Sequence, residues 1–538
     1  MTFDWQTWYD DFRGYSVDVD VLTNGVPRDS RSSAIDVSST WTRFPRYGYF
    51  MDFYPSESQS DSTAKTFALS KYHIDVVQFY DWLWTHDRLL PYDCAGNLLD
   101  NFRDWGYRDN SIKTITNKIN AAKGRGISPV FYDLLYCDSG NNLGPEHITW
   151  AAFDGPYQAD AKGVYDQFST IWIMDASNSD WQNWIFNQFM DAMLKLGFEG
   201  VHLDNLGGAW KYKYNSNEGI PEWTAFPNFI ANCKSALRTI NPDVTVTEND
   251  VYGGYLDIIA PSAADIYNQE VWGSDRYDDI RNLIQRAKTA GGGKSVALAA
   301  YMNFKSLFDE FGNPREPTNQ LNEASIRLMD ACVFGNGGFH VELGEDGQML
   351  SHYYWPARTP MPPTLPRVMR DYYDFAVRYE NLLVFNTLGG VTDGTDGALT
   401  WSGTHALSKD AQAGTIWTVV KNWRDEYDAA SLINLYGVDD QWRNLSGNPQ
   451  YQQNILIKYY LDKKCQHLCV ATPDDGLGRP LELSFTEGSD NLGYFVQFTV
   501  PNLKFWDLLI FDKTTRVKVA AGRVTGSARR RPGFTSGR

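Results

Sequence analysis

The chain has 538 residues and a mass of 61.2 kDa, and at roughly 150 residues per domain this length predicts two or three domains. Hydrophobic residues make up 43% of the sequence and charged residues 21%, which is typical of a globular protein and excludes a disordered one. The formal net charge is −17. So acidic a surface repels phosphate groups and anionic lipids, which argues against nucleic acid and membranes as partners.

Aromatic residues are frequent in this sequence. It holds 19 Trp, 31 Tyr and 29 Phe, which together make 15% of the chain. Large flat rings with polar tips stack well on sugars, but they are also ordinary core residues. The composition therefore leaves carbohydrate binding as one option among several.

Two features bear on the cellular compartment. No run of about 18 apolar residues occurs, so the sequence predicts no membrane-spanning segment. The chain begins MTFDWQTWYDDF, without the basic head, apolar stretch and small-residue cleavage site of a secretion signal. Either the protein is cytoplasmic, or it is secreted and this sequence lacks its true N-terminus.

The six cysteines fit no tetrahedral zinc spacing. Cys465 and Cys469 flank Gln-His-Leu, and a local disulfide between them is as compatible with the sequence as two free thiols. Cys94 and Cys137 follow two successive predicted strands, so a pair between them is a further option.

The first 42 residues predict a small amount of β structure. The runs YSVDVDVL (15–22) and AIDVSS (34–39) surround the turn-like segment NGVPRDSRS (24–32). A few strands cannot bury a core alone. Residues 1–42 are therefore interpreted as the end of a β domain or as an edge docked on the next domain.

From about residue 43 to 380, short strand-like runs alternate with helical patterns. One helix is predicted over residues 180–197, where apolar residues recur at three and four spacing after a Ser or Asp cap. The eight predicted strands are residues 46–53, 76–82, 127–136, 200–205, 244–249, 266–272, 295–302 and 337–344.

Eight strands alternating with helices over about 335 residues are typical of an α/β fold of the (β/α)8 TIM barrel type. A doubly wound open sheet is the competing architecture, but no glycine-rich phosphate-binding fingerprint follows any strand. Residues 43–380 are therefore predicted to form the catalytic barrel.

The pattern changes after residue 380. Over residues 381–513, alternating runs such as GTIWTVVKNW, ILIKYYL and YFVQFTV are separated by turn signals without a clear helix. This predicts an all-β domain of sandwich or Greek-key type. The remaining segment, residues 514–538, is basic, lacks apolar periodicity and is predicted to be disordered.

The ends of the predicted barrel strands are rich in carboxylates and aromatic rings, and catalytic groups of a barrel lie at these ends. No GxSxG, HxH or HExxH motif occurs, which weakens acyl transfer and zinc hydrolysis. Glycoside hydrolysis needs two carboxyl groups across a glycosidic bond and aromatic groups around the sugar, and this inventory fits that reaction best.

Two carboxylates stand out. Asp204 ends the fourth predicted strand in GFEGVHLDNLGG, and Glu270 ends the sixth in YNQEVWG, so both side chains can face a shared barrel axis. Each has a structural alternative. Asp204 could cap the following turn, and Glu270 could pair with an arginine such as Arg276.

Two further questions about this site are the role of the neighbouring His202 and whether the carboxylates bind a metal ion. His202 lies two residues before Asp204, so it points to the same side of the strand as a substrate ligand, an orienting group or a satisfied core residue. Asp204, Glu248 and Glu270 together resemble the carboxylates of a magnesium-dependent enolisation barrel. No lysine base stands at a neighbouring strand end, so the prediction is that no metal or cofactor is bound.

The motifs as an ordered set are similar to one family. The segments RFPRYGYFMDF, QFYDWLWTH, GFEGVHLDNLGG, NQEVWG, AAYMN, GGFHVELGE and RDYYDFAVRYENLL, followed by INLYGVDDQWRN, KYYL and FTVPNLKFWDLL, resemble glycoside hydrolase family 66. This family contains endo-dextranases and cycloisomaltooligosaccharide glucanotransferases. The resemblance extends over about residues 14–512.

The resemblance implies a (β/α)8 catalytic domain between an N-terminal immunoglobulin-like domain and a C-terminal β domain. It implies endo-hydrolysis of α-1,6 links of dextran with retention of configuration, with Asp204 as the nucleophile and Glu270 as the acid/base. The polysaccharide substrate is dextran or isomaltooligosaccharides, and the protein is expected to be a secreted monomer. The residues that the resemblance implies as substrate-binding are Tyr80, Asp81, His86, Tyr132, Asn249, Trp272 and Glu342.

The sequence departs from the family in three places. Many relatives have Asn where this chain has Asp133, which leaves the role of that residue open. The N-terminal domain is represented only by its last strands, and the segment after Lys513 has no counterpart in the family.

Two other functions stay open at this stage. Cyclising members carry an inserted carbohydrate-binding module, and no insert of about 100 residues separates Asn303 from Gly337. Hydrolysis is therefore favoured over a cyclising or transglycosylating glucanotransferase. A non-catalytic dextran-binding protein is the second alternative, and the presence of both carboxylates argues against it.

Overall fold

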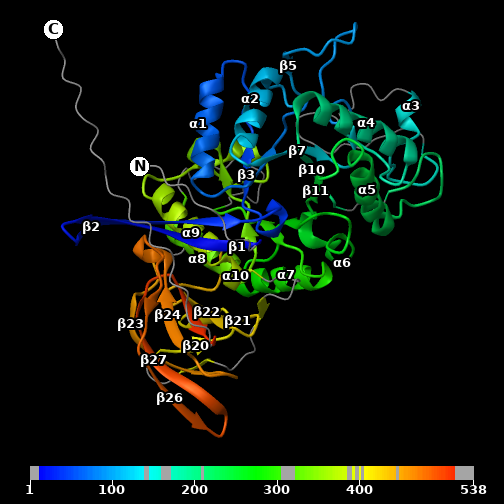
Figure 1. The fold of residues 1–538 in the computed structure, drawn as a ribbon. Coiled ribbons are helices and arrows are strands. Elements are labelled where there is room, and N and C mark those ends of the chain that lie inside the picture. The colour runs from blue at the N-terminus through cyan, green and yellow to red at the C-terminus, as the bar shows by residue number, and fades with distance from the viewer. Residues whose placement is uncertain are drawn as a thin grey trace, which may run out of the picture.

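The structure is a computed structural model of the chain. It describes residues 11–138, 145–158, 171–207, 211–303, 321–384, 391–393, 399–401, 405–443 and 447–514. Figure 1 shows an α/β body, a β module below it, and a hairpin that projects from between the two. Of the predicted C-terminal tail, only Thr514 lies within the described residues.

All eight predicted barrel strands are present, at the predicted places. They are β3 (Tyr47–Phe50), β4 (Val76–Phe79), β7 (Ser128–Leu134), β10 (Gly200–Asp204), β11 (Thr245–Glu248), β12 (Tyr267–Glu270), β13 (Val296–Ala299) and an eighth that is split into β14 (Phe339–His340) and β15 (Leu343–Gly344). The strands β3, β4, β7, β10 and β11 pair in parallel in this spatial order, and so do β12, β13 and β14. The α/β fold class is therefore confirmed.

The eighth strand differs from the continuous run that the sequence predicts over residues 337–344. His340 pairs with Leu298 of β13, whereas Leu343 pairs with Gly48 of β3. The chain thus moves from one neighbour to the other between these residues, which brings the last strand beside the first. This cyclic order is consistent with the predicted barrel. A short antiparallel extension, β16 (Gln348–Met349) and β17 (Thr359–Pro360), follows β15.

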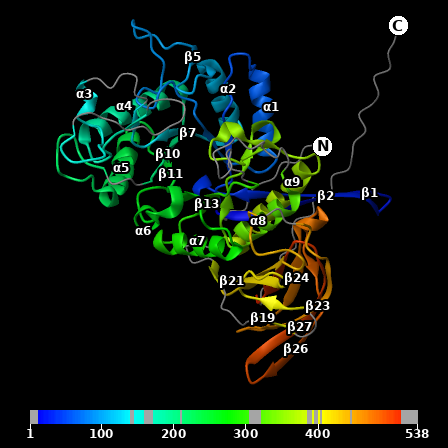
Figure 2. The same cartoon turned by 180° about the vertical axis from the view of Figure 1, so that it is seen from behind.

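Helices alternate with the strands and surround them (Figures 1 and 2). The long ones are α1 (Gln59–Ser70), α2 (Ile112–Lys123), α4 (Ser179–Leu196), α5 (Glu222–Leu237), α7 (Tyr277–Ala290), α8 (Glu323–Gly335) and α9 (Leu365–Arg378). The short ones are α3 (Pro145–Ile148), α6 (Leu256–Ile259) and α10 (Glu380–Leu383). Two further strand pairs lie in loops: β5 (Asn101–Arg103) with β6 (Asp109–Ser111), and β8 (Cys137–Asp138) with β9 (Trp172–Ile173).

The helix α4 shows why these segments fold as they do. Its cap is Asn178, one residue before the predicted Ser or Asp, and the side chain of Asn178 accepts hydrogen bonds from the backbone N–H groups of Asp180 and Trp181. The helix ends at Gly197, whose φ of 89° is the left-handed conformation that glycine adopts at little cost. The chain then enters β10, which carries Asp204.

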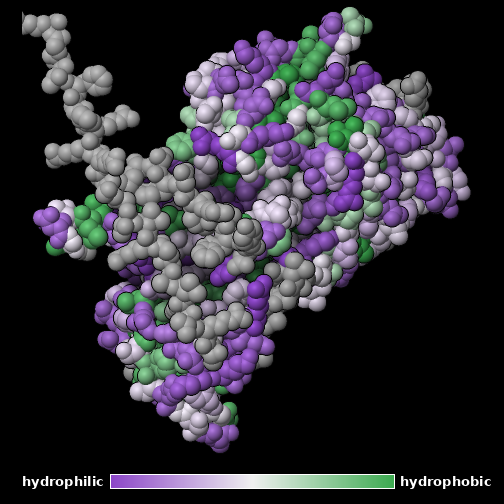
Figure 3. Space-filling view, viewed as in Figure 1, coloured by the Kyte–Doolittle hydropathy of each residue, from purple (hydrophilic) through white to green (hydrophobic). Residues whose placement is uncertain are grey.

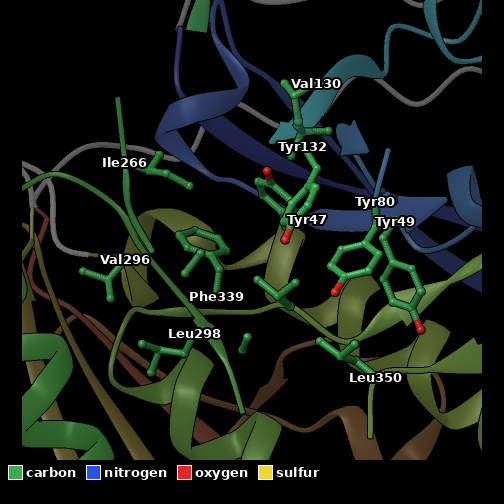
Figure 4. Close-up of a cluster of buried hydrophobic side chains, with 14 of the residues drawn as sticks. Tyr47, Tyr49, Tyr80, Val130, Tyr132, Ile266, Val296, Leu298, Phe339 and Leu350 are labelled. Atoms are coloured by element: carbon green, nitrogen blue, oxygen red, sulfur yellow. The ribbon is translucent and has the colours of Figure 1, made fainter. Parts of the chain in front are cut away.

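The core of the α/β body is rich in tyrosine. Figure 4 shows Tyr47, Tyr49, Tyr80 and Tyr132 on one side of a buried cluster, with aliphatic residues such as Leu298 on the other. Tyrosine buries a large ring but needs a partner for its hydroxyl. These hydroxyls make the interior polar near the carboxyl ends of the strands, where a functional site is expected.

The N-terminal hairpin consists of β1 (Arg13–Thr23) and β2 (Val26–Val37). Its turn is only Asn24 and Gly25, both with positive φ (53° and 78°), which is the geometry of a two-residue hairpin loop. The predicted turn over residues 24–32 is therefore wrong, because most of that segment lies in β2. Turn-forming residues occur throughout residues 24–32, so the sequence did not show that the turn itself is only Asn24-Gly25.

The β module contains two sheets around a common apolar cluster, which is consistent with the predicted sandwich. One sheet holds β18 (Val391–Asp393), β20 (Leu407–Ser408), β21 (Ile416–Trp423), β22 (Tyr427–Asn434), β24 (His467–Ala471), β25 (Leu481–Glu482) and β28 (Trp506–Asp512). The other holds β19 (Leu399–Trp401), β23 (Gln452–Tyr460), β26 (Phe485–Asp490) and β27 (Gly493–Leu503). Their strands pair antiparallel except for β20, which pairs with β21 in parallel.

Asp474 of the β module joins it to the α/β body. Its carboxylate accepts hydrogen bonds from Arg327 of α8 at 2.7 Å and from the hydroxyl of Tyr372 of α9 at 2.9 Å. The other oxygen of Asp474 accepts from the backbone N–H of Phe505 at 2.8 Å. A buried carboxylate with several donors stabilises a fixed orientation of the two parts.

Three further observations concern the whole molecule. All six cysteines are free, so neither of the disulfides considered from the sequence is formed. Within the described residues, no helix has both the length and the apolar character that crossing a bilayer requires. In Figure 3, hydrophilic residues are widespread among the described residues of the face in view, in keeping with the net charge of −17, and a hydrophobic patch lies on its upper part.

Arg46 holds three segments together where the hairpin meets the body. Its guanidinium lies 3.0 Å from a carboxylate oxygen of Asp36, 2.8 Å from Asp75 and 3.5 Å from Glu380. Arg46 is 6% exposed, and Glu380 is 2% exposed. Removing the cation would leave buried carboxylates without a counter-charge.

We expect Arg46→Met to lower the free energy of unfolding by about 3–5 kcal/mol, because breaking a buried ion pair leaves its partners uncompensated. Denaturant unfolding followed by circular dichroism would measure this. Arg31→Met is the matched control, because Arg31 pairs with Asp29 in the open, with exposed fractions of 78% and 51%. It should change the free energy by less than about 0.5 kcal/mol. Equal effects of the two substitutions would contradict the prediction.

Candidate functional site

A pocket of about 390 Å³ opens at the carboxyl ends of the parallel strands. Its walls are mainly aromatic, and two carboxylates, Asp204 and Glu270, lie among them. The aromatic residues that line it are Tyr80, Trp105, Tyr132, Tyr252, Trp272, Tyr353 and Tyr354. A concave site with flat rings and a few acidic groups suits a sugar.

Asp204 is the last residue of β10, and its carboxylate is held by three donors. The Tyr132 hydroxyl donates to Oδ2 at 2.8 Å, and the Asn249 side-chain amide donates to Oδ1 at 2.7 Å. The backbone N–H of Asn205 donates to Oδ1 at 2.7 Å. Three donors fix the orientation of this carboxylate and favour its ionised form.

Glu270 is the last residue of β12, and both Glu270 and Asp204 are hydrogen-bonded to Asn249. The side-chain oxygen of Asn249 accepts a hydrogen bond from the backbone N–H of Glu270 at 3.0 Å. The Trp272 indole donates to Oε2 of Glu270 at 3.1 Å, and the Tyr301 hydroxyl donates to Oε1. Asn249 therefore binds both carboxylate residues at once, through its amide nitrogen and its amide oxygen.

The two carboxylates differ in their electrostatics. Burial raises the pKa of Glu270 to about 7, and the nearby charge of Asp204 adds to the effect. Burial also raises the pKa of Asp204, while the hydrogen bonds from Asn249, Tyr132 and Asn205 lower it. Two acidic groups whose surroundings favour different protonation states are typical of acid/base catalysis.

Stacked rings form the wall beside these carboxylates. Tyr80 stacks on Trp355, with ring centroids 4.7 Å apart and planes 12° apart. Tyr80 also contacts Tyr132 at 4.6 Å between centroids, and Trp272 contacts Tyr301 at 5.3 Å. The rings hold one another and the groups that donate to the carboxylates, which makes the pocket preorganised.

Non-glycine residues with positive φ follow the strands that carry the site. Asp81 after β4, Asn205 after β10 and Asn303 after β13 have φ values of 47°, 71° and 57°. Tyr252, which lines the pocket, has a φ of 67°. Left-handed backbone at such residues is strained, and strain of this kind clusters at functional sites.

The structure places six of the predicted site residues at the pocket and buries the other three. Asp204, Glu270, Tyr80, Tyr132, Asn249 and Trp272 line the pocket or its floor. The other three, Asp81, His86 and Glu342, are at most 1% exposed. The role of these three as sugar ligands stays a prediction.

Each of these three buried residues faces other protein groups. Asp81 lies 3.8 Å from the guanidinium of Arg108. His86 hydrogen-bonds through Nδ1 to Asp133 at 2.8 Å, and burial lowers the pKa of His86 to about 3. Asp133, the position where this chain departs from many relatives, is thus the partner of a predicted site residue.

Glu342 belongs to a separate buried group. Its Oε1 accepts from the Tyr373 hydroxyl at 3.0 Å, and its Oε2 lies 3.2 Å from Nδ1 of His340. His340 also contacts Asp330 at 3.0 Å and the backbone oxygen of Ala300 at 2.9 Å. These contacts join buried side chains that do not line the pocket themselves.

Sequence reasoning missed Tyr301, Tyr353 and Trp355. Tyr301 donates to Glu270, and the other two line the pocket floor together with the carboxylates. Tyr301 lies near the end of the strand predicted over residues 295–302, which was an available signal. Tyr353 and Trp355 lie in the run HYYWPA after the eighth strand, where only the aromatic composition hinted at a role.

Among the residues that the structure describes, three clusters of side chains have the types and spacing to bind a metal ion, with ligand atoms within 4.8 Å of one another. None includes Asp204 or Glu270. In one of them, Glu345 already pairs with Lys118 at 2.5 Å. The clusters are Asp87, Asp138 and His147; Asp330, His340 and Glu342; and Asp52, Glu345 and Asp346.

A paired set of carboxylates in an aromatic pocket, at the carboxyl ends of parallel strands, defines a glycoside hydrolase. A family model described as glycosyl hydrolase family 66 matches residues 1–510. The chain therefore belongs to glycosyl hydrolase family 66, as the sequence motifs indicated.

Two relatives and one solved structure place the chain within the family. A cycloisomaltooligosaccharide glucanotransferase of Niallia circulans is 29% identical over 649 aligned residues, which cover 96% of this chain and 66% of that protein. A dextranase of Streptococcus salivarius is 23% identical over 578 residues, which cover 94% of this chain and 68% of that protein. The chain thus spans just under two thirds of the length of the glucanotransferase.

The solved structure is a cycloisomaltooligosaccharide glucanotransferase of a Paenibacillus species in complex with cycloisomaltoheptaose. It superposes with a TM-score of 0.87 at 26% identity and covers 95% of this chain and 90% of that one. Because the superposed region covers 95% of this chain, it includes both the α/β body and the β module.

We expect Tyr301→Phe to raise the pKa of Glu270 further above 7, because the lost hydroxyl donor stabilises the ionised carboxylate. Infrared difference spectra against Glu270→Gln would isolate the carboxyl band of Glu270 and follow its titration. Tyr92→Phe is the control, because Tyr92 donates to the distant carboxylate of Asp191 at 2.6 Å. A lower or unchanged pKa in Tyr301→Phe would contradict the assignment of this hydrogen bond.

Proposed function

We propose that the chain is a retaining endo-dextranase, which hydrolyses internal α-1,6-glucosidic links of dextran. The observation that carries the proposal is the pair Asp204 and Glu270, joined by Asn249 inside an aromatic pocket. Family membership and a dextranase among the relatives support the choice of substrate.

In the proposed mechanism, Asp204 attacks the anomeric carbon and Glu270 protonates the leaving oxygen. A pKa of about 7 lets Glu270 carry a proton near neutral pH at the start of the reaction, while the donors on Asp204 favour its ionised form. After the first step the negative charge of Asp204 is consumed in the glycosyl ester, which removes one cause of the raised pKa. Glu270 can then act as the base that activates water.

We propose the following organisation around this site. The two parallel ladders close into a (β/α)8 barrel within residues 43–380, and residues 381–513 form the C-terminal β domain. Residues 1–42 are the edge of an immunoglobulin-like β domain. This arrangement is supported by the strand pairing and by the similarity to the glucanotransferase structure.

We prefer hydrolysis over cyclisation because this chain has fewer residues than the glucanotransferase over the aligned region. The alignment with that relative runs over 649 positions, whereas 96% of 538 residues is about 516. About 130 of its positions therefore lack a counterpart here, which is the size of a domain. The same difference for the dextranase, 578 positions against about 506 residues, is about 70.

A cyclising or transglycosylating glucanotransferase is the second candidate. The observation that favours it is the higher identity to the Niallia circulans glucanotransferase, 29% against 23% for the dextranase. Both functions use the same two carboxylates and differ in whether water or a sugar hydroxyl resolves the intermediate.

We also propose that the enzyme acts outside the cell and as a monomer. Dextran is a polymer too large to enter a cell intact, so a hydrolase of internal links meets its substrate outside. The net charge of −17 is compatible with a single dispersed chain.

We expect Asp204→Asn and Glu270→Gln each to lower kcat/KM on dextran by at least about 1,000-fold, because each removes one of two groups that the reaction needs. Circular dichroism should show an unchanged fold. Reducing-sugar release measures the rates.

The small-residue variants give the sharper outcome. With azide, Glu270→Ala should give the α-glucosyl azide and Asp204→Gly the β-anomer, because azide replaces a different group in each. Near-normal rates in both the Asn and the Gln variants would refute the assignment of the two carboxylates. Binding of dextran by the wild type without any release of reducing sugar would favour a non-catalytic dextran-binding protein.

We expect linear isomaltooligosaccharides as the main products from dextran. Mass spectrometry detects cyclic products because ring closure eliminates one water relative to the linear oligomer. Incubation with isomaltooligosaccharides instead of dextran serves as the control for transfer. A predominance of cycles would show that the second candidate is correct.

A further inference from the structure

Directly beneath the two carboxylates lies a second layer of polar side chains. Residues two apart on a strand point to the same side. Asp204 and Glu270 are preceded at that spacing by His202 and Asn268. Tyr80, which lines the same pocket, is preceded in the same way by Gln78 of β4.

This layer is polar where the interior of a barrel is usually filled by branched apolar residues. One of its members, His202, has hydrogen-bond partners inside the body. Nδ1 of His202 lies 2.9 Å from the Thr247 hydroxyl and 3.2 Å from the Tyr47 hydroxyl. His202 is thus held inside the body by its own partners.

Gln78 is different. It is 1% exposed, and within the part of the chain that the structure describes neither its side-chain nitrogen nor its side-chain oxygen has a hydrogen-bond partner. A buried amide without partners costs about 1–3 kcal/mol per group. Such a residue in a native structure calls for a group that pairs with it when the protein works.

Gln78 lines a notch that could admit such a group. The notch has a volume of about 20 Å³ and shares its walls with Asp204, Glu270, His202 and Asn268. That volume holds one group of the size of water or hydroxyl, and no sugar ring. Asn268 adds a second amide, so the notch offers donors and acceptors together.

We propose that the side-chain amide of Gln78 hydrogen-bonds one secondary hydroxyl of the glucose whose anomeric carbon Asp204 attacks. The inference rests on the proposed function, and it makes Gln78 a specificity-determining residue. In an α-1,6-linked chain O6 is used in the linkage, so the hydroxyls at C2, C3 and C4 are the ones free to enter. Without sugar, a single water occupies the notch and pairs with the amide.

The proposal predicts opposite effects on activity and stability. Gln78→Leu removes the amide that binds the hydroxyl, so kcat/KM on dextran should fall about 10- to 100-fold. The melting temperature should stay the same or rise, because a buried amide without a protein partner is replaced by an apolar group of similar size.

Gln182→Leu is the matched control. Gln182 lies in α4, and its amide is paired: it donates to Ala176 at 2.8 Å and accepts from Asn232 at 2.9 Å. The same substitution there should lower the melting temperature and leave kcat/KM within twofold. If Gln78→Leu behaves like Gln182→Leu, Gln78 is a structural residue and the proposal is wrong.

A second arm identifies the hydroxyl. Aryl α-isomaltosides that lack the hydroxyl at C2, C3 or C4 of the aryl-bearing glucose are compared with the parent compound. For one of the three deoxy compounds, the kcat/KM of the wild type should fall by about the factor by which Gln78→Leu lowers kcat/KM on the parent compound. The kcat/KM of Gln78→Leu should then be nearly the same on that deoxy compound as on the parent, because the variant already lacks the contact. Additive losses for all three compounds would overturn the proposal. Gln78→Met replaces Gln78→Leu if that variant does not fold.

The failure of this proposal is distinct from the failure of the proposed function. If the wild type releases no reducing sugar from dextran, the proposed function is wrong and the assignment of Gln78 falls with it. If the wild type is active while Gln78→Leu keeps its kcat/KM and all deoxy compounds are additive, only the assignment of Gln78 is wrong.

Discussion

The candidate site depends on the two hydrogen bonds of one side chain, Asn249. Its amide nitrogen donates to Asp204 at 2.7 Å and its amide oxygen accepts from the backbone of Glu270 at 3.0 Å. Asn249 follows β11, which lies between the strand of Asp204 and that of Glu270 along the chain. An amide is suited to this position because it donates to an anion on one side and accepts from an N–H on the other. The spacing of the two carboxylates therefore follows from the strand that separates them.

The same arrangement separates the protonation states of the two acids. Asp204 receives three donors, whereas Glu270 is buried beside a negative charge and its pKa rises to about 7. Rings that support one another, such as Tyr80 on Trp355, line the pocket beside the two partly exposed carboxylates. Partial burial strengthens the hydrogen bonds and the charge interactions of these groups. Packing and electrostatics thus act together, and the stacked wall is part of what determines the chemistry.

The layers of the α/β body have different tasks. The outermost inward-facing residues, Tyr80, Asp204 and Glu270, line the pocket. The layer below is polar and contains His202, which has its own partners, and Gln78, which has none among the described residues. Aliphatic residues such as those in Figure 4 fill other parts of the interior. A partly unpaired polar layer lowers stability, and proteins retain such groups where function requires them.

The sequence by itself determined the strands and the two carboxylates at their ends. Strand positions follow from short β-branched and aromatic runs bounded by glycine or proline, and the period of two places Asp204 and Glu270 on inward-facing positions. Only the tertiary structure decided which other side chains meet them. Tyr353 and Trp355 reach the pocket from a loop about 150 residues beyond Asp204 in the chain, and Asp133 pairs with His86 behind the wall. Such contacts between distant segments depend on how the strands close on one another, which no local pattern encodes.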